Sequence, residues 1–259
     1  MYAPQRQDVI AGQIQDLGGA SVSELAERYG VSAETVRRDL DTLERQQRVT
    51  RVHGGAVPFR VHSGNEHTVA TRATSSKDAK VRIAAAAAGH FPPSGGSVLV
   101  DSGTTTALLC QHLAERTDLT VVTNSVLLSY ELSLQGPTTD GRRLHLVGGR
   151  VRGITQSVVG AESVSGLRGL RADVAFLGAN GVTTDFGFST PDPSEAQTKA
   201  AMTGAARRRI ALVDRSKLGE ELLCAFATVD DVDLLITDAP PDDPVVRGLR
   251  QQGMDVIHT

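Results

Sequence analysis

SVLVD (97–101) is the first of six apolar, β-branched runs that alternate with Ala- and Leu-rich stretches beyond Lys77. Alternation of this kind is typical of βαβ units around a parallel sheet. Nearly every run ends in a small or polar cluster, and ligands of open α/β sheets bind at the carboxyl ends of the strands. We therefore predict an α/β domain with a ligand site at that end of a parallel sheet. The other five runs are LTVVTN (119–124), LHLVGG (144–149), DVAFLGANG (173–181), RIALVD (209–214) and DLLITD (233–238).

The segment DSGTTT (101–106) follows the first of these strands and precedes the helical stretch ALLCQHLAE (107–115). Backbone amides at the start of that helix, together with Ser and Thr hydroxyls, form a cradle for an anion such as phosphate. Gly103 allows the backbone to approach a ligand closely. The alternative is a plain strand-to-helix turn with Ser or Thr caps. Because the other strands also end in polar clusters, we favour a ligand site.

Two lysines and three carboxylates are further candidates for this site. Lys217, in DRSK, and Lys199, in SEAQTKAAM, each offer a point charge and three donors to a phosphate or a sugar, or else are solvated surface residues. Asp101, Glu195 and Asp214 are candidates to accept sugar hydroxyls. A carboxylate is repelled by a phosphate, so we expect a site with a phosphate end and a separate hydroxyl end.

The first sixty residues have the pattern of a small separate module. Ser21 and Glu24 predict a capping box at the start of a second helix, and Ser32 caps a third. Residues 49–56, VTRVHGGA, alternate apolar and polar before a glycine pair, which predicts a β-ribbon or wing. A helix, a tight turn, a polar-faced helix and a wing together predict a winged helix-turn-helix.

Positive charge in this module is concentrated in one place. The first sixty residues carry eight Arg and eight Asp or Glu, but five of the arginines fall within fifteen positions. An exposed Arg37 and Arg38 pair, with Thr35 beside it, is placed to reach bases and phosphates of DNA from the third helix. The alternative is a solvated helix face in which Arg38 pairs with Glu34 and Arg37 with Asp41.

Composition excludes several classes of protein. The 259 residues are 40% hydrophobic and 22% charged, with a net charge of −3, which indicates a folded chain without a global basic field. Cys110 and Cys224 lie far apart, which excludes a disulfide framework or cysteine zinc site, and we expect both to be buried thiols. We expect no metal and no cofactor, because the histidines are scattered and neither a P-loop nor GxGxxG occurs. Without an apolar membrane span or a signal peptide, the expected location is cytoplasmic.

Two separated groups of motifs resemble the DeoR family of bacterial transcriptional regulators over nearly the whole chain. VSAETVRRDLDTLERQQRVTRVHGGA (31–56) is similar to the family's DNA-binding signature. We accordingly divide the chain into a winged helix-turn-helix domain (1–57), a linker (58–76) and a sensor domain (77–259). Motifs similar to those of the family's sensor domain follow in the expected order, namely DSGTTT (101–106), TNS (123–125), GGRVRGITQSVVG (148–160), FLGANGV (176–182) and VDRSKLG (213–219).

The resemblance implies a winged-helix DNA reader joined to a sensor domain whose fold is like that of ribose-5-phosphate isomerase. It also implies that a phosphorylated sugar binds the sensor and releases a repressor from double-stranded operator DNA. The residues assigned to DNA are Ser32, Thr35, Arg37, Arg38, Arg51 and His53. The residues assigned to the effector are Asp101, Ser102, Gly103, Thr104, Thr105, Thr106, Asn124, Gly149, Arg150, Asn180, Gly181, Glu195, Lys199, Asp214 and Lys217.

The chain departs from the family pattern at three positions near this site. Arg215 stands where the family often has Ser, and Leu218 and Val158 replace Phe residues. These changes leave the phosphate site intact and the identity of the sugar open. Among effectors we favour fructose 1-phosphate or another hexose or ketose phosphate, because such ligands are common in the family. We also expect a homodimer or homotetramer.

A competing hypothesis is an aldose–ketose sugar-phosphate isomerase with an accessory N-terminal module. In that case Asp101, Glu195 or Lys199 would transfer protons. The helix-turn-helix signature favours the regulator, because an isomerase has no use for a DNA reader while a regulator can reuse a sugar-phosphate pocket. We therefore predict no catalytic residues.

Overall fold

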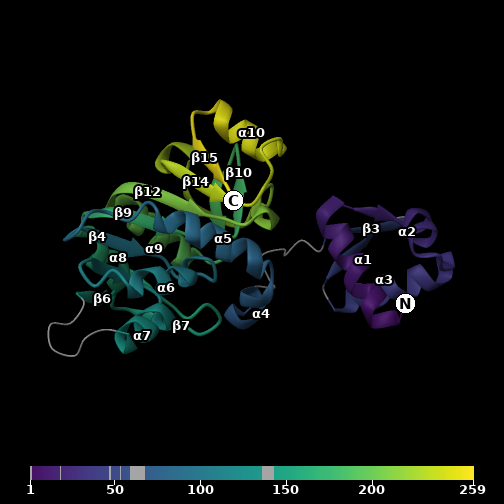
Figure 1. Cartoon of the computed structure of the whole chain (residues 1–259), viewed down its shortest axis with the longest axis horizontal. Coiled ribbons are helices and arrows are strands. Elements are labelled where there is room, and N and C mark those ends of the chain that lie inside the picture. Colours follow the sequence, from purple (N-terminus) through teal and green to yellow (C-terminus); the bar gives the residue numbers. More distant parts are fainter. Residues whose placement is uncertain (1, 18, 47, 53, 59–67, 136–142) are drawn as a thin grey trace. The chain divides into compact units, whose positions relative to one another are not determined.

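A helical module with a small sheet forms the N-terminal part of the chain, and a seven-stranded sheet forms the centre of the rest (Figure 1). The computed structural model describes every residue except 1, 18, 47, 53, 59–67 and 136–142. Internal contacts divide the chain into two units, Met1–His62 and Ser63–Thr259, and each is described by itself. The division falls inside the segment expected to be a linker.

Three helices and three short strands form the N-terminal unit. They are α1 (Ala3–Leu17), β1 (Ala20–Ser21), α2 (Val22–Tyr29), α3 (Ala33–Arg45), β2 (Val49–Val52) and β3 (Gly55–Pro58). The expected capping box is present, because the Ser21 hydroxyl accepts from the Glu24 N–H and the Glu24 carboxylate accepts from the Ser21 N–H. Gly30, with a φ of 62°, ends α2 in the left-handed conformation and makes the turn into α3.

The expected wing is the antiparallel hairpin of β2 and β3. Strand β1, which the sequence pattern did not predict, pairs with β3 and completes a sheet of order β1-β3-β2. Helix α3 therefore packs between two other helices and a small sheet, as in a winged helix. The fully buried side chains in the core of the N-terminal unit are Ile10, Ile14, Leu25, Val36, Leu40, Leu43 and Val49.

Seven parallel strands form the central sheet of the C-terminal unit. In spatial order they are β15 (Asp255–His258), β14 (Leu234–Thr237), β12 (Ala206–Leu212), β9 (Ala172–Leu177), β4 (Ser97–Val100), β5 (Thr120–Thr123) and β6 (Leu144–Leu146). All six predicted runs are strands of this sheet, and β15 is an addition at one edge. The predicted α/β architecture with a parallel sheet is confirmed.

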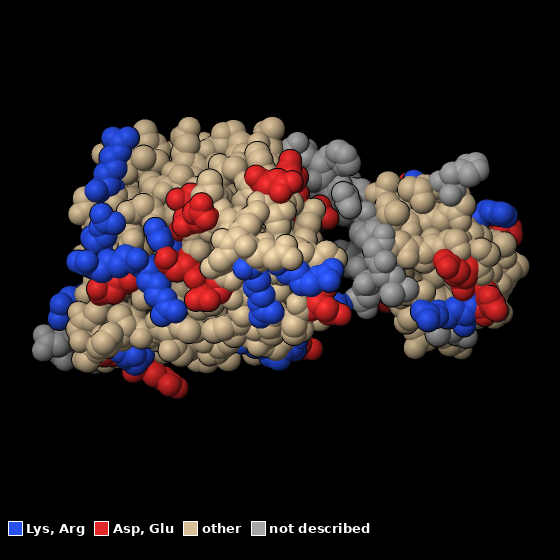
Figure 2. Space-filling view, turned by 90° about the horizontal axis from the view of Figure 1, so that it is seen from above, with Lys and Arg blue, Asp and Glu red and all other residues tan. Residues whose placement is uncertain are grey.

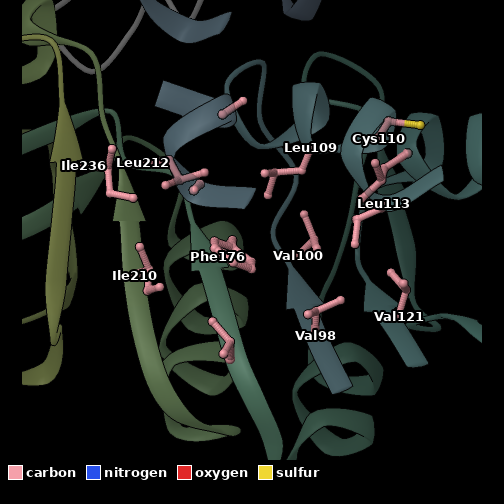
Figure 3. Close-up of a cluster of buried hydrophobic side chains, with 14 of the residues drawn as sticks. Val98, Val100, Leu109, Cys110, Leu113, Val121, Phe176, Ile210, Leu212 and Ile236 are labelled. Carbon is pink, nitrogen blue, oxygen red and sulfur yellow. The ribbon is translucent and has the colours of Figure 1, made fainter. Parts of the chain in front are cut away.

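Helices cover both faces of this sheet. Helices α5 (Lys77–Ala88), α6 (Leu109–Ala114) and α7 (Val126–Leu134) pack on one face, and α8 (Ala161–Arg168) and α9 (Pro193–Gly204) on the other. Val98 and Val100 of β4 belong to the first of these apolar layers, and Leu99 between them belongs to the second. Figure 3 shows the first layer, in which Phe176 lies among aliphatic side chains of neighbouring strands. The sheet is buried on both sides, which explains the continuous apolar runs in the sequence.

Smaller elements connect the strands of the central sheet. A hairpin of β7 (Arg150–Arg152) and β8 (Ser157–Val159) follows β6, and β10 (Gly181–Thr183), β11 (Gly187–Thr190) and β13 (Cys224–Ala227) form a separate sheet. The remaining elements are α4 (Val69–Thr74), α10 (Pro244–Gln251) and the 3-10 turns η1 (Thr106–Leu108), η2 (Arg215–Lys217) and η3 (Val229–Asp231).

The structure differs from the expectations at two places outside the sheet. Helix α4 lies within the segment expected to be a linker. The Thr68 hydroxyl caps this helix by accepting from the Thr71 N–H at 3.3 Å. Cys224 is only half-buried on the small sheet, while Cys110 is buried as expected. None of the described helices has the length and apolar character that a membrane span requires.

Candidate functional site

The carboxyl ends of the central strands bring many of the predicted ligand residues to one end of the sheet. From β4 the chain continues to β5 and β6 on one side, whereas β9, on the other side of β4, is followed by β12 and β14. Ligands of α/β sheets bind where the strand order diverges in this way. Asp101 directly follows β4 and Gly178 directly follows β9, so both residues lie at the point of divergence.

A buried ion pair lies at this point. Lys199 of α9 donates through Nζ to Asp101 Oδ2 and to the Gly178 carbonyl (2.9 Å), and the Gly178 N–H donates to the same Oδ2 at 3.0 Å. Asp101 Oδ1 is also buried and has no hydrogen-bond partner among the described residues. Burial raises the pKa of the Asp101 carboxyl, and the nearby Lys199 opposes that shift. A buried acceptor without a donor is costly, so Oδ1 marks a position that suits a hydroxyl of a ligand.

The loop after β4 is fixed by the loop after β5. The Ser102 N–H donates to Asn124 Oδ1 at 2.8 Å, and Asn124 Nδ2 donates to the Val158 carbonyl at 3.4 Å. Asn124 therefore links the loops after β4 and β5 to strand β8, and its contact with a sugar stays a prediction. The N–H groups of Gly103 and Thr104 form no hydrogen bond within the described ranges. These two donors are available to an anion.

Threonines shape the end of this loop. Thr105 and Thr106 are buried, and Thr106 Oγ1 donates to the Gly103 carbonyl at 3.1 Å. A Cβ atom on Gly103 would lie 3.0 Å from that Thr106 hydroxyl, so the packing of the loop itself favours glycine. The chain enters the 3-10 turn η1 before the short α6, where the sequence pattern predicted one continuous helix.

Glu195 of α9 lies in a buried network that the sequence analysis did not predict. Its Oε1 accepts from Thr155 Oγ1 (2.5 Å) and Ser157 Oγ (2.8 Å), and it pairs with Arg152 Nη1 at 3.4 Å. Its Oε2 lies 3.4 Å from Thr190 Oγ1, whose single proton has a nearer acceptor in Asn180 Oδ1 at 3.1 Å. Three of these partners come from the hairpin within GGRVRGITQSVVG, of which we had assigned only Gly149 and Arg150. Because the hydrogen bonds of Glu195 are concentrated on Oε1, Oε2 is the oxygen that can accept from another donor.

Four other predicted effector residues make no hydrogen bond with Asp101 or Glu195 that the structure records among the described residues. Asn180 Oδ1 accepts from Thr190 Oγ1 at 3.1 Å, so its amide is partly used within the protein. A Cβ atom on Gly181 would lie 2.3 Å from a backbone carbonyl, and one on Gly149 would lie 2.4 Å from a serine hydroxyl, so both glycines permit close packing. Arg150 is exposed on β7. Asn180 and the two glycines support the shape of the site, whereas no contact with the described residues distinguishes Arg150 from a solvated residue.

A second group of charges lies after β12. Buried Asp214 accepts from the Ser216 N–H (3.2 Å) and hydroxyl (2.5 Å) and so caps η2, which carries the half-buried Lys217. Lys80 of α5, which the sequence analysis did not select, is also buried, and its Nζ donates to the Arg72 carbonyl at 2.6 Å. Burial lowers the pKa of Lys80 to about 8, with Asp214 opposing the shift and Lys217 and Arg72 adding to it. One carboxylate and two cations therefore act on the charge of Lys80.

Lys80 could have been found from helical periodicity. In KDAKVRIAAAAA (77–88) it shares a face with Ile83, Ala84 and Ala87, all of which are buried. A lysine on an apolar helix face must find a polar partner or a ligand. The described residues contain no cluster of His, Cys, Asp or Glu that could hold a metal ion.

Helix α3 of the N-terminal unit exposes several residues assigned to DNA. The Ser32 hydroxyl caps the helix by accepting from the Thr35 N–H at 3.1 Å, and the two hydroxyls lie 2.9 Å apart. Arg37 and Arg38 are both exposed. Arg37 pairs weakly with Glu34 at 3.4 Å, whereas Arg38 has no acidic partner in the described part of the unit. The pairing of Arg38 with Glu34 that we had considered is therefore wrong.

Arg51 ties the wing to α3. Its Nη1 pairs with Asp41 and donates to the Arg37 carbonyl at 3.3 Å, and its N–H donates to Glu44 Oε1 at 2.9 Å. Asp41 therefore pairs with Arg51 and not with Arg37. His53 lies outside the described residues. Figure 2 shows basic and acidic side chains next to one another on the visible face of this unit, which agrees with its small net charge.

Asp39, in the TVRRDL motif, is a buried residue that we had not assigned. Arg6 of α1 donates to it through Nε (2.6 Å) and Nη2 (3.3 Å), and Gln7 Nε2 donates at 2.9 Å. These bonds fix α1 against the inner face of α3. The signal was present in the sequence, because Asp39 lies at helical spacing with Val36 and next to Leu40 on the inward face.

Comparisons with known proteins agree with both units. Residues 6–59 match the DeoR-like helix-turn-helix domain, and residues 75–239 match the DeoR C terminal sensor domain. The HTH-type transcriptional regulator FruR of Bacillus subtilis is 34% identical and covers 92% of each chain. The glycerol-3-phosphate regulon repressor of Escherichia coli K12 is 30% identical over 96% of each chain.

A solved structure is similar to part of the C-terminal unit. Ribose 5-phosphate isomerase A from Methanocaldococcus jannaschii is 22% identical with a TM-score of 0.39, over 56% of this chain and 55% of its own. This likeness is too weak to indicate an activity. The two domain matches fall in order on the two units of the structure, and the relatives match over nearly their whole lengths. The chain therefore belongs to the DeoR family of helix-turn-helix transcriptional regulators.

Proposed function

We propose that this regulator is a repressor of sugar-metabolism genes, released from its operator by a phosphorylated sugar bound at the carboxyl ends of the central strands. The observation that carries the proposal is the division of charge in that region. Asp101 and Glu195, which pair with Lys199 and Arg152, form an acidic group with unsatisfied acceptor capacity, while Lys80 and Lys217 form a cationic group. A sugar phosphate has hydroxyl donors at one end and an anion at the other, which matches this division.

The phosphate is assigned to the cationic group and the loop after β4. The free N–H groups of Gly103 and Thr104 supply two donors, and α5, which carries Lys80, packs against both η1 and β12. Lys217 adds a second ammonium on η2. Charge-assisted hydrogen bonds of this kind are roughly twice as strong as neutral ones, so the phosphate supplies much of the affinity.

The sugar hydroxyls are assigned to the acidic group. Asp101 Oδ1 is a buried acceptor without a partner among the described residues, and Glu195 Oε2 has one long contact. Burial raises the pKa of Asp101, and the charge of Glu195, which lies on the same helix as Lys199, adds to that shift. A polyhydroxylated ligand can satisfy both oxygens, whereas a bare phosphate would be repelled there.

We also propose that the site does not isomerise its ligand. An isomerase needs a carboxylate or amine that is free to move a proton between adjacent carbons. Lys199 is held by Asp101, and the available oxygens of Asp101 and Glu195 are assigned to sugar hydroxyls, while the relatives similar over nearly the whole chain are named as a regulator and a repressor. Incubation with pentose and hexose phosphates tests this point, since turnover at enzymatic rates would favour the isomerase instead.

Calorimetry on the full chain tests the effector class. Fructose 1-phosphate should bind and free fructose should not, because only the former reaches the cationic group. Lys217→Ala should abolish the response while leaving operator binding intact, which gives a permanently repressing protein. Lys77→Ala is the matched control, because Lys77 is exposed at the start of α5. Equal affinity for both sugars would contradict the assignment of the phosphate.

DNA binding is assigned to α3 and the wing. Arg38 is exposed without an acidic partner in the described part of the unit, and Arg37 has only a weak one. The Arg37→Ala, Arg38→Ala double variant should weaken binding to an operator fragment selected by the full chain from random DNA. Each base-reading Arg contributes about 1–3 kcal/mol. The control is Arg168→Ala, because Arg168 is exposed on α8 of the other unit. An unchanged footprint of the double variant would refute the assignment of α3 to DNA.

A further inference from the structure

Helix α4 is held at its two ends by the two halves of the effector site. At one end the Val69 N–H donates to the Ile154 carbonyl at 3.0 Å, and the next residue after Ile154 carries the hydroxyl bonded to Glu195. Toward the other end Lys80 Nζ donates to the Arg72 carbonyl at 2.6 Å. None of the six α4 residues is buried. These two polar contacts therefore contribute to keeping α4 in place.

Like charges meet where α4 lies against α5. The positive charge of Arg72 lowers the pKa of Lys80, so the two cations repel each other in the free protein. Arg72 Nε is buried and has no hydrogen-bond acceptor among the described residues. An anion bound beside Lys80 would remove the repulsion and supply an acceptor to both side chains. Anion binding therefore strengthens the attachment of α4.

The joint between α4 and α5 is strained. Ser76 has a φ of 52°, in the left-handed region that a residue with a side chain adopts only at a cost, and its side chain makes no capping bond to α5. On the other side, ten residues of sequence separate α4 from β3, the last strand of the N-terminal unit. Helix α4 is thus weakly held in its position. Because α4 precedes α5 in the chain, its position sets where the chain leaves the sensor domain toward the DNA-binding unit.

We propose that α4 is a strap that the phosphorylated effector clamps onto the sensor domain through Arg72 and Lys80, and that the clamped strap withdraws the DNA-reading unit from the operator. This inference rests on the proposed effector site. Without effector, α4 detaches easily and the two recognition helices of a dimer can match successive major grooves. A change that weakens the attachment of α4 to the sensor domain should then lower effector affinity. By linkage, it should also lower the effect of the effector on operator affinity by the same factor.

Val69→Pro removes one attachment of the strap without disturbing its helix. Val69 is the first residue of α4, a position that proline occupies readily, and Thr68 already has the extended ψ of 159° that suits a residue before proline. The substitution deletes the N–H that bonds to Ile154. Val69→Ala, which shortens the side chain but keeps the N–H, is the matched control.

Operator and ligand titrations of the two variants test the strap, with fructose 1-phosphate as the probe. Val69→Pro should bind the probe about three- to tenfold more weakly than Val69→Ala, the effect of one lost hydrogen bond. The effect of the probe on operator affinity should fall by the same factor, while operator affinity without probe stays within about twofold. A loss of operator affinity without probe, or unchanged probe affinity, would overturn the proposal.

Hydrogen exchange on the unmodified chain gives a second test. The probe should slow amide exchange in residues 69–74 at least about tenfold, since clamping suppresses local opening. If the probe binds and exchange there does not change, the strap is wrong and the effector site stands. If neither fructose 1-phosphate nor inorganic phosphate binds, the proposed effector site fails, and the strap fails with it.

Discussion

Two buried ion pairs, one in each unit, differ in how completely their carboxylates are satisfied. In the N-terminal unit Asp39 accepts at both oxygens, from two nitrogens of Arg6 and from Gln7. In the C-terminal unit Asp101 accepts at Oδ2 from Lys199 and a backbone N–H, while Oδ1 has no partner among the described residues. A fully satisfied pair fixes helices, whereas a half-satisfied one retains capacity for a ligand. The same Asp→Asn change should therefore have different consequences at the two positions.

The largest expected effect is on folding, from Asp39→Asn. An amide must turn its NH₂ toward a donor of Arg6 or Gln7, and Arg6 loses its counter-charge in a buried place. We expect a loss of about 3 kcal/mol in the free energy of unfolding of the N-terminal unit, at the lower end for a broken buried pair because the Arg6 side chain keeps 11% exposure. Denaturant unfolding followed by circular dichroism measures it.

The control for that prediction is Asp8→Asn. Asp8 pairs with Arg48 but is 67% exposed, and exposed pairs contribute less than about 1 kcal/mol. Similar losses for the two variants would mean that burial and full satisfaction of Asp39 are not what makes its pair important.

The second effect is on ligand affinity, from Asp101→Asn. Lys199 also loses its buried counter-charge, so the unfolding free energy should fall here as well. The amide oxygen can still accept from Lys199, and the NH₂ replaces the oxygen that has no partner. A sugar hydroxyl that donates to Oδ1 would then meet a donor, so effector affinity should fall about ten- to hundredfold, or roughly 1.4–2.8 kcal/mol. Calorimetry on the full chain measures this change. Operator binding should persist, and a variant that keeps its effector affinity would remove Asp101 from the site.

The difference between these pairs also shows what could be predicted from the sequence. The strands and the order of loops at their ends follow from apolar runs, so Asp101, Asp214 and Lys217 were placed correctly at the carboxyl ends of the sheet. Asp39 and Lys80 were available from helical periodicity, since each lies on an apolar face. Thr155 and Ser157 were not, because their contact with Glu195 joins segments 40 and 38 residues apart through packing that no local pattern encodes.

The third effect is a pH dependence of effector affinity that arises from Lys80. In the free protein burial lowers the pKa of Lys80 to about 8, with Asp214 favouring the ammonium and Lys217 and Arg72 disfavouring it. A bound phosphate favours the ammonium, so its pKa rises and binding above pH 8 takes up a proton. Effector affinity should therefore fall as pH rises above about 8, by up to about tenfold, or 1.36 kcal/mol, per pH unit.

Calorimetry between pH 7 and 9 in buffers of different ionisation enthalpy counts this proton. Lys80→Arg should remove the dependence, because a guanidinium stays charged over the whole range. Lys77→Arg, on the exposed start of the same helix, should retain it. A pH-independent affinity in the unmodified protein would place the phosphate away from Lys80.

The smallest effect concerns an exposed pair, Arg51 and Asp41, which differs from both buried pairs. Their side chains are 26% and 59% exposed, so Asp41→Ala should cost less than about 1 kcal/mol of stability. If Arg51 contacts a DNA phosphate, it must first leave Asp41, and removing Asp41 should raise operator affinity about two- to fivefold and steepen its salt dependence by about one phosphate contact. Anisotropy titrations over a range of salt measure both quantities, with Glu162→Ala on α8 as a control. Weaker operator binding by Asp41→Ala would instead show that the pair is needed to hold the wing against α3, and that Arg51 acts by positioning the wing and not by touching DNA.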